Sequence, residues 1–103
     1  MVINVTDSAS QWFQNEMGLN SGMGVRFFGK VYGKTPVHDG FSLGMVRDDH
    51  PTNPVVDEVK DGVHYFVDEL DEWFFRGYDL TIEYDEKTDG PKYEYISNGE
   101  LDK

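Results

Sequence analysis

The dipeptide Asp61-Gly62, which lies between two runs rich in β-branched and aromatic residues, constrains the fold of this chain more than any other feature. Residues 55–60 precede it and residues 63–67 follow it. Aspartate followed by glycine is favoured in a two-residue hairpin turn, because both central residues of that turn need a positive φ. The pattern therefore predicts an antiparallel hairpin, and with it a sheet of which the hairpin forms part.

Further strands are indicated where apolar residues alternate with polar ones. These segments are residues 2–5, 24–32, 41–46, 80–84 and 93–95. Asp89-Gly90 predicts a turn between the last two segments. Glycine and proline residues in 33–40 and in 48–54 predict a loop and a surface connection.

A first helix is predicted after Thr6, which is a candidate N-cap. The apolar residues Ala9, Trp12, Phe13 and Met17 follow at helical spacing, so one face of this helix belongs in the core. Gly18, or residues 20–22, would end it.

A second, short helix is predicted after Asp68, with Gly77 at its end. Its first turn holds Glu69, Asp71 and Glu72. Carboxylates are favoured at that position by the helix dipole, so acid–base catalysis is not needed to explain them.

With 103 residues the chain has room for one core. We therefore expect a single domain over residues 1–103, in which the tail at 99–103 frays. Several short strands with two helices make the fold class mostly β, of the α+β type.

The chain contains no cysteine. Disulfides, catalytic thiolates, zinc–thiolate sites and cysteine-ligated iron-sulfur clusters are therefore impossible within it.

The charge is strongly acidic, since 9 basic and 20 acidic residues give a formal net charge of −11. This balance opposes binding to nucleic acid and to anionic membranes. It is explained either by solubility or by an acidic face that docks a basic partner. Residues 1–6 carry no basic leader or long apolar stretch, so we expect a cytoplasmic protein without a membrane span.

Several short sequence motifs occur along the chain in an order typical of one family. They are Thr6-Asp7-Ser8-Ala9, Gly40-Phe41-Ser42, Asp57-Glu58-Val59, Asp61-Gly62-Val63, Phe66-Val67-Asp68, Ile82-Glu83-Tyr84 and Gly90-Pro91-Lys92-Tyr93. Through them the chain resembles the HesB/IscA-like, A-type iron-sulfur family over nearly its whole length. The resemblance implies a compact β-sandwich or pseudobarrel of mixed strands with an N-terminal helix and a second short helix. It also implies dimers or tetramers that work with the proteins of iron-sulfur cluster assembly.

The resemblance also indicates a candidate metal site. Members of the family hold their cluster through three cysteines, and alignment on residues 40–42 places His38 where the first would stand. Glu100 and Asp102 fall near the place of the other two. One histidine with two carboxylates is a known ligand set for non-haem iron, so His38, Glu100 and Asp102 form a candidate iron site. The alternative is an exposed loop histidine and a solvated tail.

Three other polar features are interpreted structurally. Residues 48–50 look like metal ligands, yet the prolines around them are typical of a surface connection. His64 is out of phase with its apolar neighbours and is given no role. The chain has no Gly-x-Ser-x-Gly and no His-Glu-x-x-His motif, so an enzyme is not expected.

Aromatic residues are consecutive at 27–28 and at 73–75, so at least one of each group should point away from the main core. The resulting apolar surface would serve a homodimer or higher homo-oligomer, unless a second internal face absorbs it.

The sequence thus favours a non-catalytic scaffold, carrier-related or accessory protein of the iron-sulfur biogenesis family that has lost thiolate ligation. The alternatives are a protein–protein interaction module without metal, and a binder of a single iron or other divalent ion.

Overall fold

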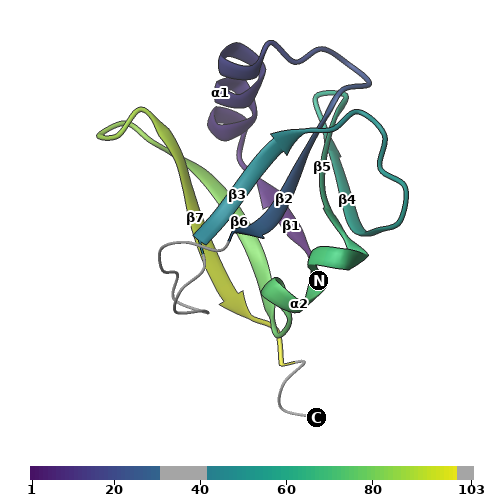
Figure 1. The fold of residues 1–103 in the computed structure, drawn as a ribbon. Coiled ribbons are helices and arrows are strands. Elements are labelled where there is room, and N and C mark those ends of the chain that lie inside the picture. Colours follow the sequence, from purple (N-terminus) through teal and green to yellow (C-terminus); the bar gives the residue numbers. More distant parts are fainter. Residues whose placement is uncertain (31–41, 100–103) are drawn as a thin grey trace.

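The computed structural model describes residues 1–30 and 42–99. Within these ranges the chain forms two packed sheets, two α-helices and one 3-10 helix (Figure 1). The fold is therefore mostly β, as the sequence predicts. Residues 31–41, which include the whole of the predicted loop at 33–40, and residues 100–103 of the predicted fraying tail lie outside the described residues.

The first sheet has three strands in the order β1-β6-β7. Their bounds are β1 Ile3–Val5, β6 Tyr78–Asp85 and β7 Gly90–Ser97. The second sheet has the order β3-β2-β5-β4. Its strands are β2 Gly24–Lys30, β3 Ser42–Arg47, β4 Pro54–Lys60 and β5 Val63–Asp68. Both sheets are mixed, because β1 pairs with β6 and β2 pairs with β5 in parallel, whereas the other pairs are antiparallel.

The predicted hairpin at Asp61-Gly62 is confirmed. The two residues join β4 to β5 with φ values of 54° and 78°, and Lys60 lies opposite Val63. A turn also joins β6 to β7, as predicted, but it begins before Asp89. Residues 86–89 form a four-residue connection, and only Asp89 has a positive φ, of 50°. Gly90 already belongs to β7, opposite Asp85.

Helix α1, Asp7–Met17, has the predicted caps. The Thr6 hydroxyl oxygen accepts a hydrogen bond from the Ala9 amide at 3.2 Å, which satisfies one of the free N–H groups of the first turn. Gly18 ends the helix with a φ of 62°. Ala9 and Phe13 on its buried face are fully covered.

The core fills the space between the sheets. The rings of Phe13, Phe27 and Tyr65 meet edge to face, with centroids of Phe13 6.0 Å from Phe27 and 5.6 Å from Tyr65. The Tyr65 hydroxyl shares a buried hydrogen bond of 2.9 Å with that of Ser10. The polar atoms of these buried residues are thereby satisfied, as a dry core requires.

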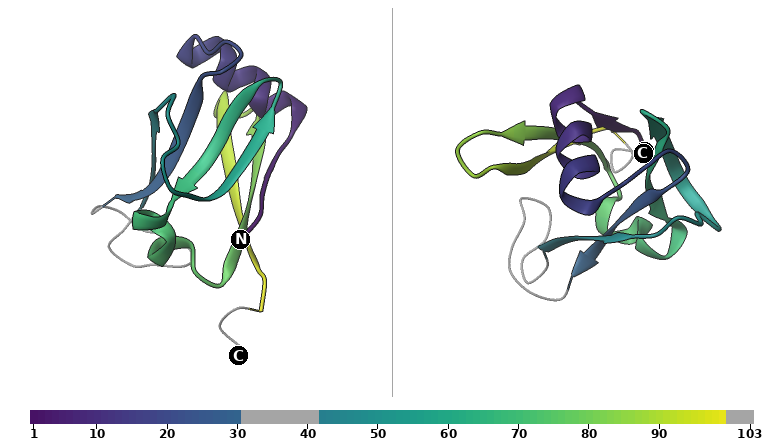
Figure 2. Two further views of the ribbon diagram at one scale, coloured as in Figure 1. Left: turned by 90° about the vertical axis from the view of Figure 1, so that its right-hand side faces the viewer. Right: turned by 90° about the horizontal axis from the view of Figure 1, so that it is seen from above.

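The 3-10 helix η1, Glu69–Asp71, and helix α2, Glu72–Phe75, follow β5 directly. They lie at the opposite end of the sheets from α1 (Figures 1 and 2). No helix in the described part of the chain is long and apolar enough to cross a membrane.

The connection over residues 48–53 joins the two edge strands of the four-stranded sheet, β3 and β4. It therefore crosses β2 and β5, on the face turned away from the other sheet (Figure 2). At its start the Gly24 amide donates to Asp49 Oδ1 at 3.1 Å, and at its end the Glu69 amide donates to the Asn53 carbonyl at 3.0 Å. Phe66 points to this face and is fully buried, so the face is covered there.

Candidate interaction site

The predicted iron ligands His38, Glu100 and Asp102 all lie outside the described residues, so the iron site stays a prediction. Among residues 1–30 and 42–99, no group of three or more histidine, cysteine, aspartate or glutamate side chains is placed to hold a metal ion.

The segment from Asp68 to Gly77 carries both buried phenylalanines and exposed apolar side chains. Asp68 Oδ1 accepts a hydrogen bond from the Leu70 amide at 3.1 Å, so Asp68 caps η1, as predicted. The Glu69 amide donates to the carbonyl of Asn53 at 3.0 Å. Gly77 ends the segment with a φ of 91°, again as predicted.

The underside of this segment is fixed in the core by two phenylalanines. Phe74 and Phe75 are 0% and 1% exposed, and their rings meet edge to face with centroids 4.9 Å apart. Phe74 lies directly on Gly29 of β2, where an added Cβ would come within 2.7 Å of its ring. A glycine is thus needed at residue 29 for α2 to pack this closely on the sheet.

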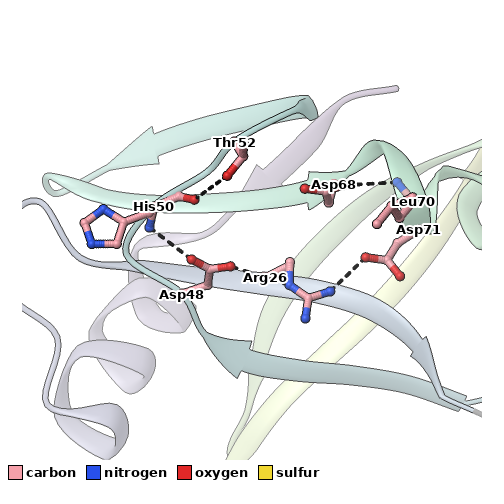
Figure 3. A network of polar contacts seen from close by, with 7 residues as sticks. All are labelled: Arg26, Asp48, His50, Thr52, Asp68, Leu70 and Asp71. Atoms are coloured by element: carbon pink, nitrogen blue, oxygen red, sulfur yellow. Dashed lines mark hydrogen bonds and ion pairs between the residues drawn. The ribbon is translucent and has the colours of Figure 1, made fainter.

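Arg26 of β2 holds the segment from the side (Figure 3). Its Nη1 donates to Asp71 Oδ2 at 2.9 Å, and its Nε lies 3.7 Å from Asp48 Oδ2 in the crossing connection. The guanidinium carbon is 5.1 Å from the centre of the Phe28 ring, which is close enough for a cation–π contact. One side chain therefore connects β2, the crossing connection and η1.

Asp71 is the more buried partner of this ion pair, with 15% of its side chain exposed against 31% for Arg26. Burial raises the pKa of Asp71 above its ordinary value, while the hydrogen bond and charge of Arg26 act in the opposite direction. Arg26 is thus the group that makes an ionised carboxylate tolerable at this position.

The upper face of the segment is apolar and open. Leu70 is 79% exposed and Trp73 is 47% exposed. Residues three apart in helical geometry lie on the same side, so the two side chains form one raised strip. Glu69 precedes Leu70 and Glu72 precedes Trp73 in the chain. We call the surface of Glu69, Leu70, Glu72 and Trp73 the α2 ridge. As expected for residues 73–75, one aromatic points away from the core and two enter it.

A small indentation of about 160 Å³ adjoins the ridge. It shares Glu72 with the ridge and is otherwise lined by Met1, Val55, Phe75 and Arg76. Val55 is 41% exposed, so apolar surface continues from α2 to the first residues of β4.

A second cleft, of about 380 Å³, lies between α1 and the β6–β7 hairpin, and most of the residues that line it are polar or charged. Trp12 Nε1 donates to the Asp89 carbonyl at 3.0 Å, and the Tyr84 hydroxyl donates to Asp89 Oδ1 at 2.7 Å. The polar side chains here hold the hairpin against the helix.

His64 has a partner that the sequence does not reveal. Its Nδ1 lies 2.9 Å from Asp57 Oδ2 and 3.0 Å from Oδ1, so the pair joins β5 to β4 across the sheet. The sequence also gives no sign of the Arg26–Asp71 pair, because its members are 45 residues apart. Leu70 carries a local signal, since it is apolar and stands between acidic residues.

None of the protein-family models matches this chain. It is 38% identical over 95 residues to a protein of Bacillus subtilis strain 168 named pyruvate dehydrogenase inhibitor. The matched region is 92% of this chain and 99% of that protein. This chain belongs to the family of the pyruvate dehydrogenase inhibitor.

The fold is also that of SufA from Escherichia coli, a protein involved in biosynthesis of iron-sulfur clusters. The two structures superpose with a TM-score of 0.57 over 93% of this chain and 80% of that one, at 18% sequence identity. The predicted HesB-like fold is therefore confirmed. Within that fold, this member of the inhibitor family has no cysteine.

Proposed function

We propose that this chain inhibits pyruvate dehydrogenase by binding to it, without catalysing a reaction itself. The observation that carries the proposal is the 38% identity to the Bacillus subtilis inhibitor. Since the alignment spans nearly all of both chains, the whole domain corresponds to that inhibitor rather than one part of it.

The surface of the chain supports an inhibitor that works by contact. Affinity depends on how little a surface must be reordered on binding, and the α2 ridge is fixed by its buried phenylalanines and by Arg26. A net charge of −11 favours rapid association with a positively charged surface. Both properties agree with the interaction module that the sequence leaves open.

The test is to titrate purified chain into purified pyruvate dehydrogenase from the same organism and to follow the rate of pyruvate oxidation. We expect saturable inhibition, and co-elution of the two proteins in gel filtration. An unrelated protein of similar size and net charge is the control for nonspecific electrostatic effects. Full enzyme activity at a large excess of chain, with no co-elution, would contradict the proposal.

A role beside iron-sulfur cluster biogenesis, as a scaffold, carrier-related or accessory protein, stays a prediction. The fold shared with SufA agrees with the fold that this prediction implies. At 18% identity the likeness concerns the fold and not the role. Metal analysis of anaerobically purified protein tests the iron-binding form of that prediction.

A further inference from the structure

We infer that the α2 ridge is the surface with which this chain docks, and that Leu70 and Trp73 enter an apolar pocket surrounded by basic residues on the partner. The inference rests on the proposed function, which makes that partner pyruvate dehydrogenase.

The first argument is exposure. At 79%, Leu70 is the most exposed of the large apolar side chains in the described part of the chain, and Trp73 stands beside it at 47%. Tryptophan is enriched among the residues that contribute most to protein–protein affinity. The indole meets the Phe74 ring edge to face, with centroids 5.8 Å apart, so the exposed Trp73 is packed against a buried aromatic ring.

The second argument is that the ridge is already ordered. The Asp68 cap and the Arg26–Asp71 ion pair hold its backbone in place (Figure 3). The hydrogen bond from the Glu69 amide to the Asn53 carbonyl fixes it further. Exposed apolar groups on a mobile loop would lose conformational entropy on binding. The ridge is already ordered and loses little, so more of the free energy gained by burying its apolar surface contributes to affinity.

The third argument is shape. The indentation lined by Met1, Val55, Phe75 and Arg76 adjoins the ridge and shares Glu72 with it. The chain thus offers a projection and a hollow side by side, and a partner can fill the hollow while it receives the projection.

Charge selects the partner. Glu69 and Glu72 lie within the ridge, and the whole chain carries −11. A second copy would bring the same carboxylates against these, and like charges facing one another weaken association. Nucleic acid and anionic membranes are repelled as well. A pocket bordered by lysine or arginine complements both the apolar and the acidic parts of the ridge.

The experiment measures inhibition of pyruvate dehydrogenase by the parent chain and by Leu70→Ala, Trp73→Ala and Val59→Ala. Val59 is the matched control, because it is an apolar residue with 52% exposure at the opposite end of β4. We expect each ridge variant to weaken inhibition at least tenfold and Val59→Ala to leave it within twofold. Glu69→Gln combined with Glu72→Gln should reduce the dependence of inhibition on salt.

Trp73 contacts Phe74, so its truncation can disturb α2; Leu70→Ala and a circular dichroism spectrum of each variant guard against that. Parental inhibition by Leu70→Ala and Trp73→Ala would overturn the docking surface and leave the proposed function intact. Absence of inhibition by the parent would instead overturn the proposed function. If Trp73→Ala converts a dimer to a monomer with unchanged inhibition, the ridge is a contact between copies and the inference is wrong.

Discussion

Arg26 on β2 and Asp71 on η1 form a 2.9 Å ion pair, although 45 residues separate them in the sequence. The same guanidinium lies 3.7 Å from Asp48 in the connection that crosses the sheet. Removal of this one side chain therefore loosens two neighbouring segments and leaves the half-buried carboxylate of Asp71 without its partner.

We expect Arg26→Gln to lower the free energy of unfolding by about 1 to 2 kcal/mol. The loss is smaller than for a fully buried pair because 31% of the Arg26 side chain is exposed to screening water. Urea denaturation measures the change. The control is Arg47→Gln, whose pair with Asp49 lies at the surface, and which should leave the urea midpoint nearly unchanged.

Gly29→Ala should displace α2. The new Cβ would lie 2.7 Å from the ring of Phe74, and overpacking of this kind typically costs about 1 to 3 kcal/mol. We expect a lower melting temperature and weaker inhibition, since the ridge sits on Phe74. The control is Gly90→Ala, where the nearest atom to a Cβ is 3.9 Å away. Equal stability of the two variants would show that Phe74 does not rest on Gly29 as closely as the structure indicates.

Stability should fall at alkaline pH through two tyrosines of β7. Burial raises the pKa of Tyr95 to about 12 and that of Tyr93 still further, so the folded state keeps both phenols protonated. A pKa raised on folding gives stability that is complete below the unfolded value of about 10 and is lost as the pH rises through the folded value. Urea midpoints measured between about pH 9 and pH 12 should decline, and the decline should be shallower in Tyr95→Phe.

The iron hypothesis makes its own prediction. If His38, Glu100 and Asp102 bind iron, the anaerobic protein takes up Fe(II) saturably and His38→Ala abolishes the uptake. His50→Ala is the control, because His50 lies in the crossing connection. Uptake by His38→Ala equal to that of the parent would remove this site from consideration.

Local signals made much of the fold predictable from the sequence. Asp61-Gly62 needs only its own two φ angles to make a hairpin, and Thr6, Gly18 and Asp68 act on backbone groups within a few residues. The family resemblance added the overall arrangement, which agrees with the fold of SufA.

Interactions between distant segments could not be predicted. The parallel pairs β1–β6 and β2–β5 join strands far apart in the chain, and no local pattern names their partners. The crossing connection and the Arg26–Asp71 pair depend on that strand order. Acidic residues between 68 and 72 are equally typical of a helix start, so the sequence did not show that Asp71 anchors the α2 ridge to Arg26.

Binding of the parent chain to purified pyruvate dehydrogenase, followed by isothermal titration calorimetry, tests the proposed function most directly. We expect saturable binding with a fixed stoichiometry, and an affinity that falls as salt increases. The proposed function is contradicted if no heat of binding is detected at two temperatures and at low and high salt, and if the enzyme keeps full activity in the same mixture.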